Sequence, residues 1–292
     1  MSFTQEEIAT QPECWLRAAE AAASAGDALP SPGEEVAVVG CGTSLYMARS
    51  YASLREEAGH GRTDAFAASQ FPAGRRYDRI VALTRSGTTT EVIDLIAAVQ
   101  GAAASTVITA DGSTPAAVAA DHVLSLPFAD EQSVVQTRFA TTALALLRAH
   151  LGEDLAPAAQ DARRALAEPL DPRWVQAGQV TFLGTGWTGG LADEAALKMR
   201  EAAGAWTESY LAMEYRHGPI SIAAPGRVVW VFGPAPAGLS EDITRTGAIL
   251  VGSDRDPLAE LVLAQRLAVA CAEAAGLDPD RPRNLTRSVV LV

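Results

Sequence analysis

The sequence predicts an α/β fold built from two doubly wound parallel sheets in tandem. Short apolar runs alternate with longer helical patterns, which is typical of strand–helix–strand units. The second half repeats the opening of the first half, since "EVAVVGCGTS" at 35–44 and "QVTFLGTG" at 179–186 are both an apolar run followed by a glycine turn. Repeat units of about 150 residues have domain size. We therefore expect domains at 1–155 and 156–292.

In the first half, an alanine-rich segment predicts a helix over 4–26 that ends near Gly26. A second helix is expected over 43–59, where a hydroxyl side chain opens it and Gly59 closes it. Further apolar and periodic segments predict strands at 36–39, 64–68, 79–84, 105–109 and 122–126, and helices at 88–100 and 135–151.

The pattern changes at "EDLAPAAQDARRALAEPLDPR", a helical segment bounded by prolines that we take as the domain boundary. After it the alternation of strands and helices begins again. The second half predicts strands at 179–184, 227–232 and 248–251 and helices at 188–204 and 257–275.

Charge and composition exclude several classes of function. The 292 residues carry a formal net charge of −12, which disfavours nucleic acid as a partner because nucleic acids are bound mainly through phosphate neutralisation. The three cysteines are far apart and lack metal-ligand spacing, so we expect a reducing cytoplasm and no metal site. The acidic N-terminus is unlike a signal peptide, and no apolar run is long enough for a membrane span.

Two turns of the first half favour an anion site. Gly40–Ser44 and Thr84–Thr89 each follow an expected strand and precede an expected helix, and both are rich in glycine and hydroxyl side chains. In a doubly wound sheet, ligands bind at the carboxyl ends of the strands, and a helix N-terminus attracts anions. The alternative is that these hydroxyl side chains only cap helices.

The second half offers a rival site. "GTGWTG" at 184–189 fits the glycine pattern of dinucleotide-binding turns, and Glu208 lies about 20 residues further on, where that fingerprint has an acid. On the following helix, Glu194, Lys198 and Glu201 share one face because of their spacing. Lys198 is the only lysine in the chain. The alternative for this face is a solvated ion pair.

Three motifs resemble one family. "GCGTS" and "TRSGTTTE" resemble the two signature loops of sugar isomerase (SIS) domains, which have a flavodoxin-like fold. "EAALKMREAAGAWTESYLAMEYRHGP" and the tail "DRPRNLTRSVVLV" resemble the isomerase domain of glucosamine-6-phosphate synthase and related amino-sugar-phosphate isomerases and deaminases. The resemblance covers about residues 8–292 as two SIS domains and outweighs the dinucleotide alternative.

The resemblance implies roles for individual residues. Glu201 matches the carboxylate that moves a proton between C1 and C2 of the sugar, and His217 matches the histidine of ring opening, often given by a neighbouring subunit. Glu194 and Lys198 match positions that line the same site. The phosphate group would be bound by Thr43, Ser44, Thr84, Arg85, Ser86 and Thr89, and the sugar by Gly42, Val134, Gln136 and Arg287.

The sequence departs from the family at three positions, with Arg85 in place of a glutamine, Arg138 in place of a lysine, and Arg287 in place of the tail lysine associated with ring opening. Arginine stays protonated and cannot replace an amine. The resemblance implies an isomerase or deaminase acting on an amino-sugar 6-phosphate, with two alternatives left open. One is a lyase that uses the same carboxylate on N-acetylglucosamine 6-phosphate, and the other is a non-catalytic sugar-phosphate sensor.

The resemblance also sets expectations about partners. It implies a homodimer that shares His217 across the subunit interface, a small-molecule sugar phosphate as ligand and no cofactor. Because the sequence begins directly with the isomerase half, we expect no amidotransferase domain of the kind that supplies ammonia in the synthase. Deamination is therefore expected rather than synthesis.

Overall fold

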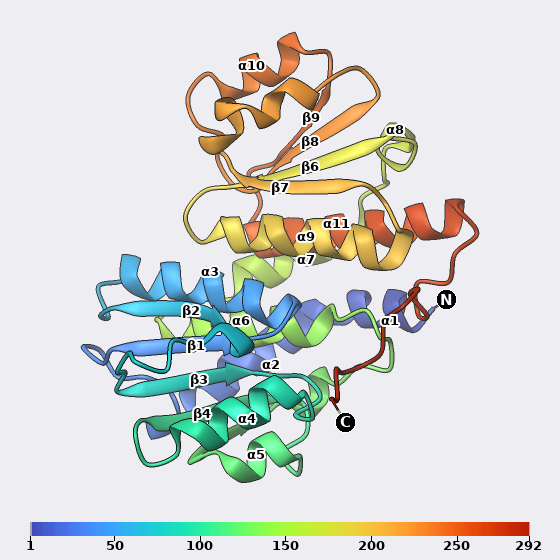
Figure 1. The fold of residues 1–292 in the computed structure, drawn as a ribbon. Coiled ribbons are helices and arrows are strands. Elements are labelled where there is room, and N and C mark those ends of the chain that lie inside the picture. The colour runs from blue at the N-terminus through green and yellow to red at the C-terminus, as the bar shows by residue number, and fades with distance from the viewer. Residues whose placement is uncertain (1, 292) are drawn as a thin grey trace. The chain divides into compact units, whose positions relative to one another are not determined.

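The computed structural model describes residues 2–291, and they divide into two compact units (Figure 1). The β1–β5 unit contains Glu13–Gln132, Arg138–Leu155 and the tail from Thr286. The β6–β9 unit contains the residues up to Pro12, Ser133–Thr137 and Ala156–Leu285. The chain passes from one unit to the other after Pro12, Gln132, Thr137, Leu155 and Leu285. The domains expected at 1–155 and 156–292 stay a prediction.

The β1–β5 unit contains a five-stranded sheet in the order β2-β1-β3-β4-β5, and every neighbouring pair is parallel. All five strands of the first half were expected within a few residues of their observed positions. They are β1 (Val36–Gly40), β2 (Thr63–Ala67), β3 (Arg79–Leu83), β4 (Ala104–Thr109) and β5 (His122–Ser125).

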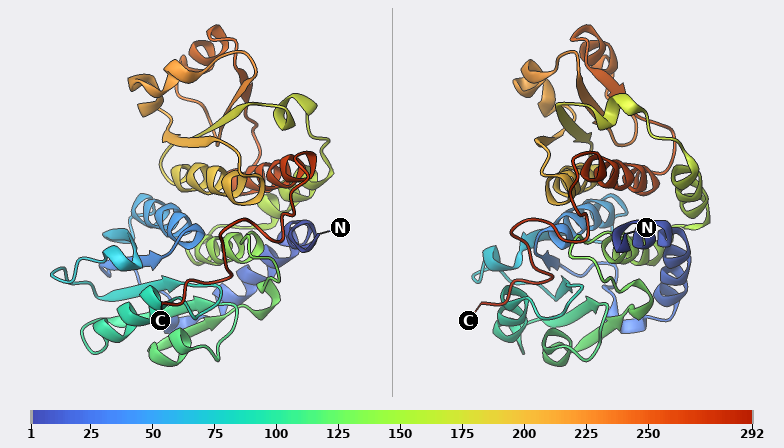
Figure 2. Two further views of the ribbon diagram at one scale, coloured as in Figure 1. Left: turned by 45° about the vertical axis from the view of Figure 1, so that its right-hand side comes forward. Right: turned by 90° about the vertical axis from the view of Figure 1, so that its right-hand side faces the viewer.

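The central strands are buried on both faces, which explains their continuous apolar runs. Ala37 and Val39 of β1 face the same cluster as Ile80 of β3, and helix α4 covers that cluster with residues such as Leu95. Helix α3 packs against β1 and β2 and contacts α6 (Figures 1 and 2). The helices of this unit are α2 (Gln11–Ala23), α3 (Thr43–Glu57), α4 (Thr90–Val99), α5 (Pro115–Ala119) and α6 (Arg138–His150).

The helix expected over 4–26 is divided. Helix α1 (Phe3–Ala9) ends before Thr10, and α2 begins at Gln11. Pro12 explains the break, because proline lacks a backbone N–H and is tolerated only in the first turn of a helix. A new helix must therefore begin close to Pro12.

The β6–β9 unit contains a parallel four-stranded sheet in the order β7-β6-β8-β9. Its strands are β6 (Gln179–Gly184), β7 (Thr207–Leu211), β8 (Arg227–Val231) and β9 (Ile249–Val251). The edge strand β7 was not expected, because its "TESYL" sequence is polar and only partly buried. Together the two parallel sheets confirm the predicted fold class.

Helices α9 and α11 of this unit pack against each other, and α7 packs on α11. Leu239 and Ile243 of α10 lie in a cluster with Val229 and Val231 of β8. Besides α1, the helices of this unit are α7 (Ala156–Ala167), α8 (Pro172–Val175), α9 (Thr188–Ala203), α10 (Leu239–Arg245) and α11 (Pro257–Ala274). Short 3₁₀ turns occur in both units. The β1–β5 unit has η1 (Gly26–Ala28), η2 (Ala68–Gln70) and η3 (Pro127–Ala129), and the β6–β9 unit has η4 (Glu214–His217) and η5 (Pro219–Ile222).

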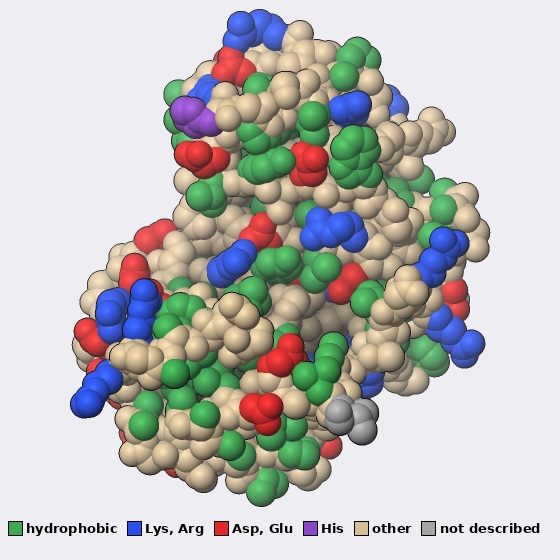
Figure 3. All heavy atoms as spheres, in the orientation of Figure 1, with side chains coloured by type: hydrophobic (Ala, Val, Ile, Leu, Met, Phe, Trp, Pro, Cys, Tyr) green, Lys and Arg blue, Asp and Glu red, His purple; other side chains and the backbone are tan. Residues whose placement is uncertain are grey.

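The surface carries basic and acidic side chains interspersed on the face shown in Figure 3. Among residues 2–291, the structure contains no helix long and apolar enough to cross a membrane.

The glycine pattern at 184–189 is explained by close packing of strand on helix. A Cβ atom at Gly184 would lie 2.2 Å from the Thr188 carbonyl oxygen. The Thr188 hydroxyl donates to the Thr185 carbonyl at 3.0 Å and lies 3.1 Å from the Phe232 carbonyl. These contacts connect the turn to the neighbouring strand without any nucleotide.

We predict that Gly184→Ala lowers the free energy of unfolding by at least about 2 kcal/mol, because the new methyl group would overlap backbone that cannot move easily. Urea unfolding followed by circular dichroism measures the change. Gly178→Ala is the matched control, since a Cβ atom there meets nothing within 4 Å. Equal effects of the two substitutions would contradict the packing explanation.

Candidate functional site

The two turns expected to hold an anion lie at one edge of the β1–β5 sheet. β1 and β3 pair in parallel, with Val39 opposite Ala82. Gly42–Ser44 and Thr84–Thr89 follow these strands directly, so both turns lie at the carboxyl edge. This is the position at which doubly wound sheets bind ligands.

The first turn depends on two glycines. Gly42 has φ 55° and ψ −124°, a conformation that side chains disfavour, and it precedes the first residue of α3. A Cβ atom at Gly40 would lie 2.7 Å from Cβ of Ser44, so the turn packs closely against the start of the helix. Thr43 and Ser44 are consequently held in nearly buried positions at the helix N-terminus.

The second turn is stabilised by its own hydroxyl groups. The Thr84 hydroxyl accepts from the Gly87 amide at 3.2 Å, and the Ser86 hydroxyl accepts from the Thr88 amide at 3.3 Å. Gly87 has φ 60°, and a Cβ atom there would collide with Thr114. Thr89 precedes α4 without capping it through its side chain. The partly exposed Ser86 and Thr89 are therefore the hydroxyl side chains of this turn best placed for a ligand.

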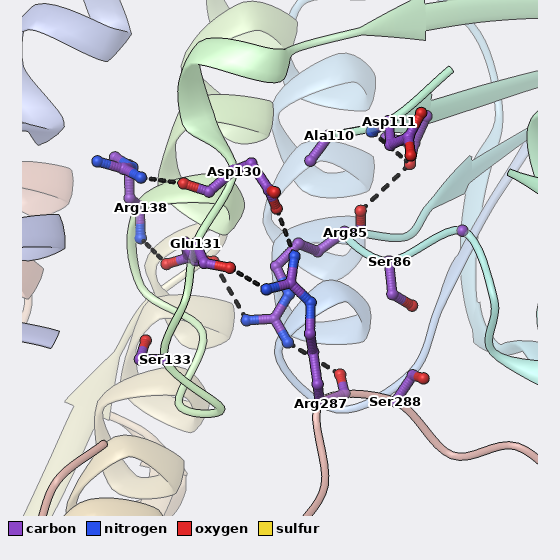
Figure 4. Close-up of polar contacts among 12 residues, drawn as sticks. Arg85, Ser86, Ala110, Asp111, Asp130, Glu131, Ser133, Arg138, Arg287 and Ser288 are labelled. Atoms are coloured by element: carbon purple, nitrogen blue, oxygen red, sulfur yellow. Dashed lines mark hydrogen bonds and ion pairs between the residues drawn. The ribbon is translucent and has the colours of Figure 1, made fainter. Parts of the chain in front are cut away.

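Arg85 does not point into solvent. Its guanidinium is nearly buried, lies 3.5 Å from the fully buried Glu131 carboxylate and donates to the Arg287 carbonyl at 2.8 Å (Figure 4). Arg287 in turn pairs with the Asp130 carboxylate at 2.5 Å and donates to the Glu131 carbonyl. Two of the three arginines that depart from the family thus lie in one cluster with two acids.

Arg138, the third such arginine, borders the same cluster. Its amide donates to the Glu131 carboxylate at 2.6 Å, and its guanidinium donates to the Asp130 carbonyl (Figure 4). No separate roles for Asp130 and Glu131 could be expected from the sequence. "DEQ" is an ordinary polar loop sequence, and only the contacts with Arg85, Arg138 and Arg287 give its acids a defined role.

The C-terminal tail runs along the second turn. The Thr88 hydroxyl donates to the Ser288 hydroxyl at 3.0 Å, and the Thr90 amide donates to the Val289 carbonyl at 3.2 Å. The Leu291 amide donates to the Thr90 hydroxyl at 2.9 Å. Ser288 is a further residue for which no role was expected from the sequence.

The expected acid–base residues lie in the β6–β9 unit, on α9. Lys198 lies 3.4 Å from Glu194 and forms an ion pair with Glu201. Glu194 and Lys198 are buried and the Glu201 side chain is 19% exposed, so the solvated face considered as the alternative is wrong. Of Glu194, Lys198 and Glu201, only Glu201 has a side chain that solvent can reach.

His217 is exposed at the end of η4 and precedes Gly218, which has φ 132°. Arg216 next to it donates to the Asp242 carboxylate at 2.7 Å. This hydrogen bond lowers the pKa of Asp242. The ion pair with α10 therefore fixes the backbone from which His217 projects.

The remaining expected residues are the partly buried Val134 and Gln136, which belong to the β6–β9 unit. The residues expected to bind the phosphate belong to the β1–β5 unit, and so does Arg287. Each group is assembled within its own unit, and the expectation that both groups serve one site stays a prediction.

Cys41, in the first turn, is unsuited to nucleophilic chemistry. Burial, together with the nearby Glu91 carboxylate, raises the pKa of its thiol to about 11. At neutral pH it is therefore a thiol rather than the reactive thiolate. In the described part of the chain, no three His, Cys, Asp or Glu side chains are grouped in a way that could hold a metal ion.

We predict that Lys198→Met lowers the free energy of unfolding by about 3–5 kcal/mol, because it leaves the buried Glu194 without its cation. Chemical denaturation measures the effect. Arg245→Met removes a cation whose side chain is 74% exposed and is the matched control. A loss no larger than that of the control would show that Glu194 does not depend on Lys198.

The chain is similar to known proteins over nearly its whole length. It is 27% identical to the isomerizing glutamine–fructose-6-phosphate aminotransferase of Caulobacter vibrioides, over 99% of this chain and 59% of that protein. It is also 27% identical to the enzyme of the same name from Methanothermobacter thermautotrophicus, over 88% of this chain and 52% of that protein. The chain thus spans little more than half the length of these relatives. No protein-family model matches it.

Solved structures share the fold. Glucosamine-6-phosphate deaminase from Thermotoga maritima superposes with a TM-score of 0.85 at 24% identity, over 99% of this chain and 100% of that one. The C-terminal domain of glucosamine-fructose-6-phosphate aminotransferase from Francisella tularensis gives 0.80 at 19% identity, over 97% and 98% of the two chains. The expected resemblance and the two-sheet sugar isomerase fold are confirmed.

Proposed function

We propose that this protein is an enzyme that binds an amino-sugar 6-phosphate and moves a proton between its C1 and C2 atoms, as an isomerase or deaminase. The observation that carries the proposal is the pair of hydroxyl-rich turns at the carboxyl ends of β1 and β3. Two helix N-termini and several hydroxyl groups next to each other suit a phosphate group.

The similar proteins support the same substrate class. The relatives from Caulobacter and Methanothermobacter carry the name of an isomerizing aminotransferase of fructose 6-phosphate. The structure from Thermotoga is named as a glucosamine-6-phosphate deaminase. The substrates in these names share a six-carbon sugar with a phosphate on C6, which matches an anion cradle at one end of a site.

Glu201 is the proposed base. Converting an aldose to a ketose requires one group that removes the C2 proton and returns it to C1, and a carboxylate above both carbons can do both. Such a group contributes about 10²–10⁴-fold to the rate. The Lys198 ammonium lies between the Glu194 and Glu201 carboxylates and offsets one of their two negative charges.

The phosphate provides the orientation. Its binding by the two turns, through Thr43, Ser44, Ser86 and Thr89, would fix the reacting carbons relative to the base. We further propose that the protein is a homodimer in which His217 acts in ring opening in the partner subunit's site, because this histidine is exposed on a turn that Asp242 holds in place.

A lyase is the second candidate, and Arg287 favours it. The tail offers no amine at this position, and the Arg287 guanidinium is paired with Asp130. If the substrate nitrogen is acetylated, removal of the C2 proton can expel the C3 hydroxyl as water and leave a C2–C3 double bond. The same carboxylate, Glu201, would then begin a different reaction.

One assay distinguishes the candidates. The protein is incubated in D₂O with glucosamine 6-phosphate or N-acetylglucosamine 6-phosphate, and the products are followed by NMR. Ammonia and fructose 6-phosphate support the deaminase, and an unsaturated C2–C3 product supports the lyase. Binding without a product and without exchange at C2 would identify a sensor and contradict the enzyme.

We predict that Glu201→Gln lowers the rate of deuterium exchange at C2 by about 100-fold or more, because glutamine cannot accept the proton. Calorimetry should show that the variant still binds the sugar phosphate. Glu208→Gln on β7, where Glu208 accepts from Tyr210 at 2.9 Å, is the control and should exchange at the normal rate. Exchange that survives Glu201→Gln would remove Glu201 from the role of base.

A further inference from the structure

Arg85 contacts protein groups on two sides. Its Nη1 lies 3.5 Å from Oε2 of Glu131, and its Nη2 donates to the Arg287 carbonyl at 2.8 Å. Its own carbonyl accepts from the Ala110 amide and the Thr109 hydroxyl, both at 3.2 Å, which fixes the backbone at the end of β4. The guanidinium thus points at Glu131 and the tail (Figure 4).

Glu131 connects three parts of the β1–β5 unit. One carboxylate oxygen accepts from the Arg138 amide at the start of α6, at 2.6 Å, and the other faces Arg85. Its carbonyl accepts from the Arg287 guanidinium. Glu131 is fully buried, so its charge requires these donors.

The tail segment that Arg85 holds continues along the proposed phosphate turn. Directly after Arg287, Ser288 bonds to Thr88, and Val289 and Leu291 both bond to Thr90. The hydrogen bond from Arg85 to the Arg287 carbonyl holds this tail segment at its start. A change at Arg85 would therefore loosen the tail where it lies against the turn.

We propose that Arg85 is a positioning residue that holds the C-terminal tail against the turn after β3, through Glu131 and the Arg287 carbonyl, and that it is not itself a phosphate ligand. This proposal differs from the expectation from the sequence, which placed Arg85 among the phosphate-binding residues. The proposal rests on the proposed function only in calling that turn the phosphate site.

The geometry also explains why arginine occupies this position. A guanidinium offers donors in a rigid fork and can serve the Glu131 carboxylate and the Arg287 carbonyl together. A lysine ammonium in the same place keeps the charge next to Glu131 but has one nitrogen on a flexible chain. Arg85→Lys therefore keeps a positive charge next to Glu131 but loses the hydrogen bond to the Arg287 carbonyl.

The test measures hydrogen exchange by mass spectrometry in the substrate-free protein, in the C-terminal peptide that contains residues 286–291. Arg85→Lys should speed exchange of this peptide by about tenfold, because the variant loses one charge-assisted hydrogen bond that holds the tail. Peptides from β1 should exchange as in the unchanged protein. Arg245→Lys, in an exposed ion pair on α10, is the matched control and should leave the tail unaffected.

A second variant tests the proposal without the destabilisation that an unpaired buried charge would cause. Arg85→Met combined with Glu131→Gln removes both charges of the pair, so no unpaired charge is buried, and it should loosen the tail to the same degree. A tail that stays protected in both variants would overturn the proposal. Faster exchange of the tail and β1 by the same factor would also overturn it, because Arg85 would then only support the fold.

Ligand binding gives an independent readout. Calorimetry with glucosamine 6-phosphate should give Arg85→Lys a dissociation constant within about threefold of the unchanged protein, because the hydroxyl groups of both turns remain. Greatly weakened binding with a protected tail would make Arg85 a phosphate ligand and overturn the proposal. If the unchanged protein binds no sugar phosphate, the proposed function fails, while tail exchange still decides the role of Arg85.

Discussion

The parallel pairing of β1 with β3 is the constraint on which the candidate site depends. Adjacent parallel strands lie about 4.8 Å apart and point the same way, so the turns that follow them must be neighbours. A shift of one residue in either strand would turn its buried side chains to the opposite face. The observed register, with Val39 opposite Ala82, therefore sets the relative position of Ser44 and Ser86.

The β1–β5 unit uses arginines in its candidate site, whereas the β6–β9 unit uses a lysine. In the β1–β5 unit, Arg85 and Arg287 each contact two groups and hold loops together, which suits permanently charged, forked side chains. In the β6–β9 unit, Lys198, the only lysine in the chain, lies between Glu194 and Glu201. An ammonium on a flexible chain can stabilise either carboxylate, as proton transfer by Glu201 would require.

Much of the fold could be predicted because apolar periodicity and glycine turns are local signals. The division of the first helix at Pro12 could have been predicted from the missing proline N–H but was not, whereas the polar segment of β7 carries no signal for an edge strand. The hydroxyl turns were predictable from their position after strands. The contact of Arg85 with Glu131 was not, because it joins residues far apart in the chain through burial that only the folded unit provides.

The central claim is that the two turns of the β1–β5 unit bind the phosphate of a sugar phosphate. An NMR titration of the ¹⁵N-labelled protein with glucosamine 6-phosphate tests it most directly, with unphosphorylated glucosamine as the reference ligand. The account predicts saturable shifts of the amides of Gly42, Ser44, Ser86 and Thr89 with the phosphorylated sugar and no such shifts with glucosamine. Shifts confined to other parts of the chain, or equal responses to both sugars, would contradict it.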